Sequence, residues 1–134
     1  MKVLFYVAEL QSVDETKAKE DLLFLWANAN EVDVVGVVYE LNASNTLGEC
    51  GQGAIIDILH QYDVDAVVIA GANDFAVNKA NVCVCVKAIR EMGADVISVA
   101  NDLPRCEECL AEMMCESKEA YRRAYHCTVK IFHE

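Results

Sequence analysis

Short apolar runs alternate along the chain with segments whose apolar residues recur at helical spacing. Four runs, at about residues 3–8, 32–39, 65–71 and 95–100, have the length and composition of strands buried on both faces. The segments between them repeat apolar residues every three or four positions, which predicts amphipathic helices. The alternation predicts an α/β fold, a three-layer α/β/α sandwich with a mainly parallel sheet of four to five strands.

The segment after the first strand carries the signals of a helix start. Ser12 can cap the helix backbone, and Glu15, three residues later, can reach back to complete a capping box. An apolar stripe follows at helical spacing and is expected to face the core. It consists of Ala18, Leu22, Leu25, Trp26 and Ala29.

Two segments in the middle of the chain need interpretation. Asn42 to Gly53 contains three glycines among Asn, Ser and Thr, which favours a loop that ends before a helix beginning near Ala54. The run from Val82 to Val86 resembles a strand, but parallel strands need a long crossover, so a helix is expected from Phe75 to Met92. Gly93 stands where that helix would end.

The chain predicts a single domain over residues 1–134, with a core in residues 1–102 and a C-terminal helix and tail in residues 103–134. Asn101 to Pro104 offers a cap and an early proline for this last helix. Residues 126–133 alternate weakly and fit either an edge strand or a tail. One side of the last helix is either ordinary core or a candidate interface, and holds Leu110, Met113, Met114, Tyr121 and Tyr125.

Composition narrows the function. The net charge of −11 opposes binding to nucleic acid and to anionic lipid, so neither strong DNA binding nor a membrane is expected. No Lys or Arg occurs between Glu20 and Asn78, so no cation from that stretch can neutralise a phosphate. The first strand is too short for the apolar core of a signal peptide, which predicts a cytoplasmic protein whose seven cysteines are reduced.

Two alternatives involve metals. The predicted strand ends bear an acidic rim, Glu9, Glu40 and Asp74, which would suit a small Mg²⁺-dependent enzyme, although solvated loops of an acidic chain commonly look the same. Cys106 and Cys109 form a C-x-x-C that could join His126 and Cys127 in a zinc site or a thiol module. His126 and Cys127 are adjacent, and adjacent strand residues point to opposite faces, so both could not bind one ion from within a strand. Structural thiols are therefore favoured, and no cofactor is expected.

The order of elements over residues 1–102 resembles the catalytic domain of serine recombinases, the resolvase-like family. That family opens with Tyr-x-Arg-x-Ser, where this chain keeps Tyr6 but has Ala8 and Leu10. After its third strand the family has Asp-Arg-Leu-x-Arg, where this chain keeps Asp74 but has Phe75 and Asn78. Residues 93–98 are similar to the family's entry into its fourth strand.

The resemblance implies a catalytically silent relative. In the family the serine attacks the DNA phosphodiester and the arginines stabilise the transition state, so their replacement removes both the nucleophile and the cationic clamp. The expected function is a DNA-recombination-associated regulatory or interaction module, either oligomeric or bound to an active recombinase. An acidic chain could mask a basic DNA-binding surface through charge complementarity.

Overall fold

A five-stranded sheet organises the computed structural model, which describes residues 1–8, 13–40, 48–75, 79–104 and 127–132. The strand order is β4-β3-β1-β2-β5. β1 pairs in parallel with β2 and β3, β3 pairs in parallel with β4, and β5 runs antiparallel to β2. The predicted, mainly parallel sheet is therefore confirmed. The strands are β1 (Lys2–Ala8), β2 (Asp33–Glu40), β3 (Ala66–Ile69), β4 (Asp95–Ser98) and β5 (Cys127–Ile131).

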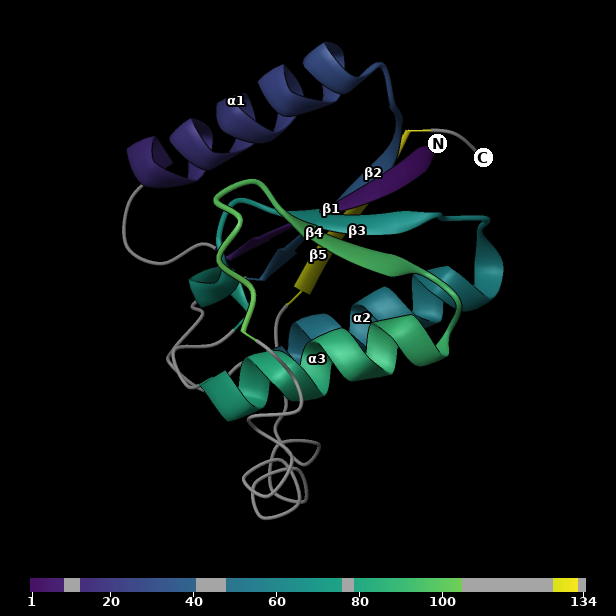
Figure 1. Ribbon diagram of the computed structural model, residues 1–134. Coiled ribbons are helices and arrows are strands. Elements are labelled where there is room, and N and C mark those ends of the chain that lie inside the picture. The colour runs from purple at the N-terminus through teal and green to yellow at the C-terminus, as the bar shows by residue number, and fades with distance from the viewer. Residues whose placement is uncertain (9–12, 41–47, 76–78, 105–126, 133–134) are drawn as a thin grey trace.

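Helices cover both faces of this sheet. α1 (Val13–Asn30) lies across one face, while α2 (Gly48–Gln61) and α3 (Lys79–Glu91) lie side by side on the other (Figure 1). A short 3-10 helix, η1 (Ala72–Asp74), follows β3. The three layers confirm the predicted sandwich.

The central strand β1 feeds two separate cores. Successive side chains of a strand point to opposite faces. Leu4, Tyr6 and Ala8 accordingly pack with α2 and α3. The alternate residues Val3, Phe5 and Val7 pack with α1. All six are buried, as expected of a strand covered on both faces.

β5 joins the sheet at a position that requires glycine. A Cβ atom at Gly36 would lie 2.3 Å from the backbone oxygen of Lys130, so no larger residue fits without moving β5. The register of β1 against β2 shifts between Val3 and Leu4, opposite this point. Of the two interpretations of residues 126–133, the described part supports the edge strand, since Cys127–Ile131 form β5 and add residues beyond position 102 to the sheet.

Two boundaries differ from the sequence-based expectation. α2 begins at Gly48 rather than near Ala54, because glycine lowers helix propensity without forbidding a helix whose later turns bury Ile55 and Ile58. Phe75 follows η1 and is not part of α3, which begins at Lys79. The run from Val82 to Val86 is helical as expected, and Gly93 follows α3 with a φ of 93°.

The apolar stripe predicted to bury α1 was wrong. The helix packs on the sheet through Leu23 and Ala27, whereas Leu22 is 43% exposed and Leu25 67% exposed. Ala18 and Ala29 are exposed as well, and Trp26 is half-buried. Apolar residues occupy two sides of this helix, so spacing alone did not indicate which side meets the sheet.

The predicted last helix, including its cap at residues 101–104, can be compared with the structure only in part. Its apolar side, with Met113, Met114, Tyr121 and Tyr125, lies outside the described residues. The described Asp102 serves another purpose, since its Oδ1 accepts hydrogen bonds from the Ala72 backbone N–H at 2.9 Å and from Ser98 Oγ at 2.6 Å. Asp102 thereby ties the end of β4 to the start of η1.

Candidate functional site

The candidate site lies at the carboxyl ends of the parallel strands, where open α/β sheets bind ligands. β1 ends here at Ala8, and β3 leads into η1 and Asp74. α1 brings a third group from the opposite layer, the ammonium of Lys19. These three groups come from separate segments that only the folded sheet places together.

Lys19 is held by two acceptors. Its Nζ donates to Asp74 Oδ1 at 2.5 Å and to the backbone oxygen of Ala8 at 3.2 Å. Lys19 lies near Thr16 and Leu23 on the side of α1 that meets the sheet, and its side chain is 21% exposed. Lys19 thus brings a positive side chain to this edge of the sheet from just outside the stretch without Lys or Arg.

Sequence reasoning missed Lys19 because it considered only the stretch from Glu20 to Asn78. A signal was present: position 19 shares the helical face of residues 16, 23 and 27, three or four positions apart. A lysine on a buried helix face needs a partner, and the nearest strand ends were known to carry carboxylates. The apolar stripe assigned to the wrong side of α1 hid this signal.

Asp74 is buried as well as paired. Its side chain is 5% exposed, and its Oδ2 accepts no hydrogen bond. Burial raises the pKa of the Asp74 carboxyl above its usual value, while Lys19 and the nearby backbone amides of Gly71 and Ala70 offset part of that rise. The site therefore combines an ion pair with one carboxylate oxygen that neither solvent nor a hydrogen bond stabilises.

This arrangement changes how the predicted acidic rim is understood. Asp74 is not a solvated loop carboxylate, since Lys19 occupies one of its oxygens and burial shields the other. A cation such as Mg²⁺ would compete with the Lys19 ammonium for Asp74 Oδ1. Glu9 lies outside the described residues, and of Glu40 only the backbone, at the end of β2, is described, so the remainder of the rim stays a prediction.

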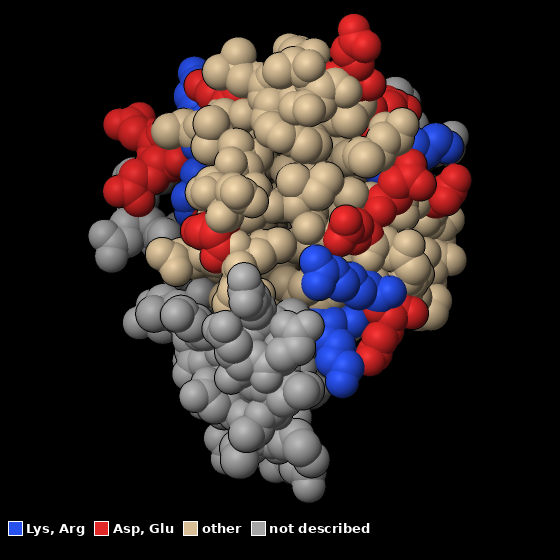
Figure 2. Space-filling view, in the orientation of Figure 1, with Lys and Arg blue, Asp and Glu red and all other residues tan. Residues whose placement is uncertain are grey.

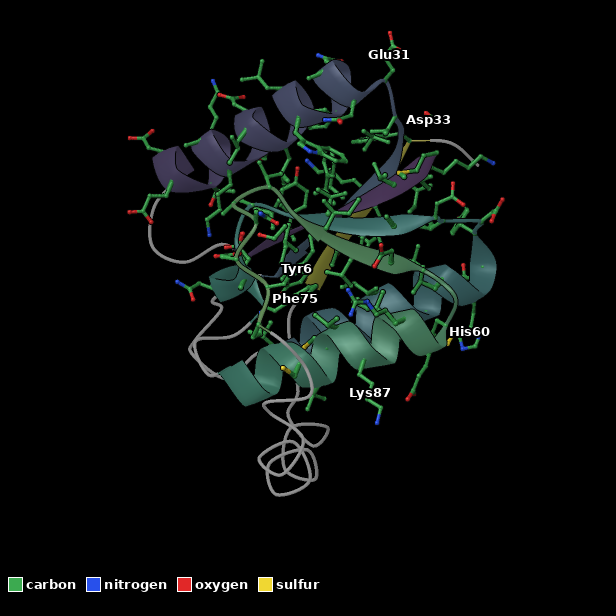
Figure 3. The ribbon with its side chains drawn as sticks, viewed as in Figure 1. Tyr6, Glu31, Asp33, His60, Phe75 and Lys87 are labelled. Atoms are coloured by element: carbon green, nitrogen blue, oxygen red, sulfur yellow. The ribbon has the colours of Figure 1, made fainter. Side chains whose placement is uncertain are left out.

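Two positions of the motifs that resemble serine recombinases are core residues. Ala8 and Phe75 are each 2% exposed and belong to the cluster between the sheet and helices α2 and α3. The Phe75 ring packs on Tyr6 with 5.3 Å between ring centroids, and the two side chains lie beside one another in Figure 3. The other two motif positions, Leu10 and Asn78, lie outside the described residues.

The thiol and metal hypothesis is left largely untested by the structure. Cys106, Cys109 and His126 lie outside the described residues, and Cys127 is the first residue of β5. Among the described residues, no three potential metal ligands converge. Cys83 and Cys85 are buried on α3, and His60 lies away from Tyr6 and Phe75 (Figure 3).

Solved structures share this architecture at low sequence identity. The N-terminal catalytic domain of TP901-1 integrase superposes with a TM-score of 0.66 at 17% identity, over 91% of this chain and 97% of that one. A resolvase family site-specific recombinase from Streptococcus pneumoniae gives 0.66 at 19% identity, over 89% of each chain. The fold is that of a serine recombinase catalytic domain.

The serine recombinase fold also occurs in a third similar structure, the C-terminal catalytic domain of ISC1926 TnpA, an IS607-like serine recombinase. Its TM-score is 0.64 at 18% identity, over 85% of this chain and 78% of that one. No protein-family model matches the sequence, and no curated protein does. No described helix has both the length and the apolar character needed to span a bilayer. The resemblance inferred from the early Tyr6 and from Asp74 is therefore confirmed at the level of fold.

Proposed function

We propose that this chain is a catalytically inactive domain with the serine recombinase fold, which acts in DNA recombination through protein contacts. The proposal rests on the residues at two motif positions, 8 and 75. Ala8 and Phe75, where the family motifs have arginines, are apolar core residues. Among the described residues at this edge, the cation is Lys19, and it is bound to Asp74.

Charge stabilisation of a phosphoryl-transfer transition state is what the described residues of this site do not provide. Each hydrogen-bond donor aimed at a developing negative charge typically lowers the barrier by about 3 kcal/mol. An ammonium already paired with a buried carboxylate has little attraction left for a phosphate. Leucine at position 10, where the family has its nucleophilic serine, offers no hydroxyl for a covalent step. These features support a domain that binds other proteins rather than one that breaks DNA.

The partner in this proposal is either a second copy of the chain or an active recombinase in the cytoplasm. We place the whole of residues 1–134 in one domain, with residues 103–134 as its divergent end. An active recombinase must present basic surfaces to DNA, and a chain with a net charge of −11 complements such surfaces.

Two measurements test the proposal. The purified chain is incubated with supercoiled plasmid, with and without Mg²⁺, and nicking is read on a gel. A recombinase of the same family, assayed on a plasmid that carries its recombination sites, serves as the positive control. The proposal expects no nicked or linear product from this chain. Nicking that disappears in an Asp74→Asn variant would overturn the inactive assignment.

The partner is tested by light scattering after size exclusion, on the chain alone and mixed with a resolvase family recombinase. A molar mass above that of the 14.8 kDa chain, or a mixed complex, is expected. A monomer in both samples would contradict the proposed interaction role.

A further inference from the structure

Helix α1 has a second apolar stripe that faces away from the sheet. We call the exposed residues Ala18, Leu22, Leu25 and Ala29 the outer stripe. Their spacing of four, three and four positions places them along one face over three helical turns. Since Leu23 and Ala27 bury the opposite side, α1 is apolar on two faces, which is typical of a helix enclosed between two layers.

The outer stripe is a continuous surface feature rather than one stray side chain. Leu25 is 67% exposed and Leu22 is 43% exposed at its centre, with alanines at both ends. Figure 2 shows an area without charged side chains where α1 lies, with charged side chains at its margins. By contrast, the exposed Phe24 ring already packs on Phe5, with 5.0 Å between ring centroids.

Acidic residues border the outer stripe. Asp14, Glu15 and Asp21 lie on α1 beside the outer stripe, and Glu31 follows the end of the helix. Lys17 is the exposed basic residue of α1. Four carboxylates and one ammonium give this border a net charge of −3. The other lysine of α1, Lys19, is turned toward Asp74 and does not offset this charge.

We infer that the outer stripe binds an amphipathic helix of a partner protein whose apolar face is flanked by lysine or arginine. Small residues at both ends let two helix axes approach closely, and two leucines between them supply the apolar contact. Basic flanks on the partner would complement the acidic border and fix the orientation of the two helices. The ligand is therefore a basic helix rather than a strand or a small molecule.

The charge of the acidic border also favours a basic helix over two other occupants of the outer stripe, a second copy of the chain and a membrane surface. In a dimer formed through α1, each copy would bring its own acidic border against the other, and like charges at an interface are unfavourable. Helices that bind membrane surfaces carry lysine and arginine on their polar faces, the reverse of this border. This inference deepens the proposed function, on which it rests for the claim that the chain acts through protein contacts.

The chain carries its own reporter for this surface. Trp26 is the single tryptophan, it is half-buried, and it lies on α1 next to Leu25 and one turn from Leu22. A helix that covers the outer stripe would change the solvent exposure of its indole. Its fluorescence emission then gives a binding curve without any label.

Two synthetic helical peptides without aromatic residues serve as probes. Both have the same Leu and Ala stripe, and their flanks are lysine in the basic probe and glutamate in the acidic probe. The basic probe is expected to shift Trp26 emission in a saturable way, and the acidic probe to bind at least about tenfold more weakly. Higher salt should weaken the basic probe.

Variants locate the contact. Leu25→Gln should weaken the basic probe by about tenfold or more, since it removes the most exposed apolar side chain of the stripe. Asp21→Lys should reduce the difference between the two probes. Val129→Thr, which alters a 40% exposed residue on β5, is the matched control and should bind like the wild type. Circular dichroism confirms that each variant is folded.

Three results would overturn the inference. They are an unchanged Trp26 emission with the basic probe, equal binding of both probes, and a dimer of the chain that Leu25→Gln converts to a monomer. Plasmid nicking would instead overturn the proposed function and leave the peptide result as it stands. A failed peptide titration in a chain that does not nick DNA removes the docking surface alone.

Discussion

Lys19 and Asp74 are 55 positions apart in the chain, yet they form the ion pair at the centre of the candidate site. The pair is asymmetric, because the Asp74 side chain is 5% exposed and that of Lys19 is 21% exposed. Removing one member of a buried pair leaves a charge that neither water nor a partner stabilises.

We expect Lys19→Met to lower the free energy of unfolding by about 3 kcal/mol at neutral pH, because it strands the Asp74 carboxylate. The double variant Lys19→Met/Asp74→Asn should regain most of that loss, since no buried charge remains. Urea unfolding of the wild type, both single variants and the double variant measures the coupling. Losses that simply add would show that the two side chains do not stabilise one another.

The Asp74 carboxyl should also make stability depend on pH. Its pKa is raised in the folded state, chiefly by burial, so the unfolded chain releases this proton at lower pH than the folded chain does. The contribution of the Asp74 carboxyl to the stability of the fold is therefore fully present below its pKa in the unfolded chain. It is lost as the pH rises through its pKa in the folded chain.

Against an Asp74→Asn variant, the wild type should therefore lose stability as pH is raised from about 3 to about 7. Urea unfolding of the two proteins at each pH gives the difference. If the wild type gained stability over the variant in this range, Lys19 would outweigh desolvation and the pKa of Asp74 would be lowered.

At the scale of elements, the attachment of β5 depends on Gly36. The backbone oxygen of Lys130 occupies the place of a Cβ atom there, and a backbone atom cannot move aside as a side chain tip can. Lys130 also lies over the Tyr39 ring, with its Nζ 5.0 Å from the ring centroid, and Phe132 donates its N–H to the Val35 oxygen. β5 is thus fixed on β2 by contacts along its length.

We expect Gly36→Ala to destabilise the protein by about 2 kcal/mol and to free the amides of residues 128–131 for hydrogen exchange. Gly71→Ala is the matched control, because a Cβ atom there meets Asp102 Oδ2 at an ordinary 3.4 Å. Exchange of β1 amides should stay slow in both variants. Unchanged protection of β5 in Gly36→Ala would mean that the strand shifts without losing its pairing.

The whole molecule is dominated by its negative charge. With 22 acidic and 11 basic residues, the chain has a net charge of −11, which repels a phosphate backbone and opposes the counterion release that drives non-specific DNA binding. We expect no change in the anisotropy of a labelled duplex with about 10 µM protein in about 50 mM salt. A rise in anisotropy that declines as salt is added would show a basic surface that compensates for the net charge.

The sequence by itself determined the layers and the order of this fold. Apolar runs of strand length that alternate with helical spacing predicted the sandwich, and the need for a crossover assigned Val82 to Val86 to a helix against its strand-like composition. The resemblance to serine recombinases followed from the order of these elements together with Tyr6 and Asp74. Such signals are local or depend on element order, so no knowledge of long-range contacts was needed.

Tertiary structure alone decided which groups meet. Two sides of α1 carry apolar residues, and only packing against Val3, Phe5 and Val7 of β1 settled that Leu23 lies inside and Leu25 outside. The same packing turned Lys19 toward Asp74, because Lys19 lies on the side of α1 that meets the sheet and Asp74 lies in η1, after the end of β3. Spacing fixes which residues share a helix face, but the face that is buried depends on the shape of the surface it packs against.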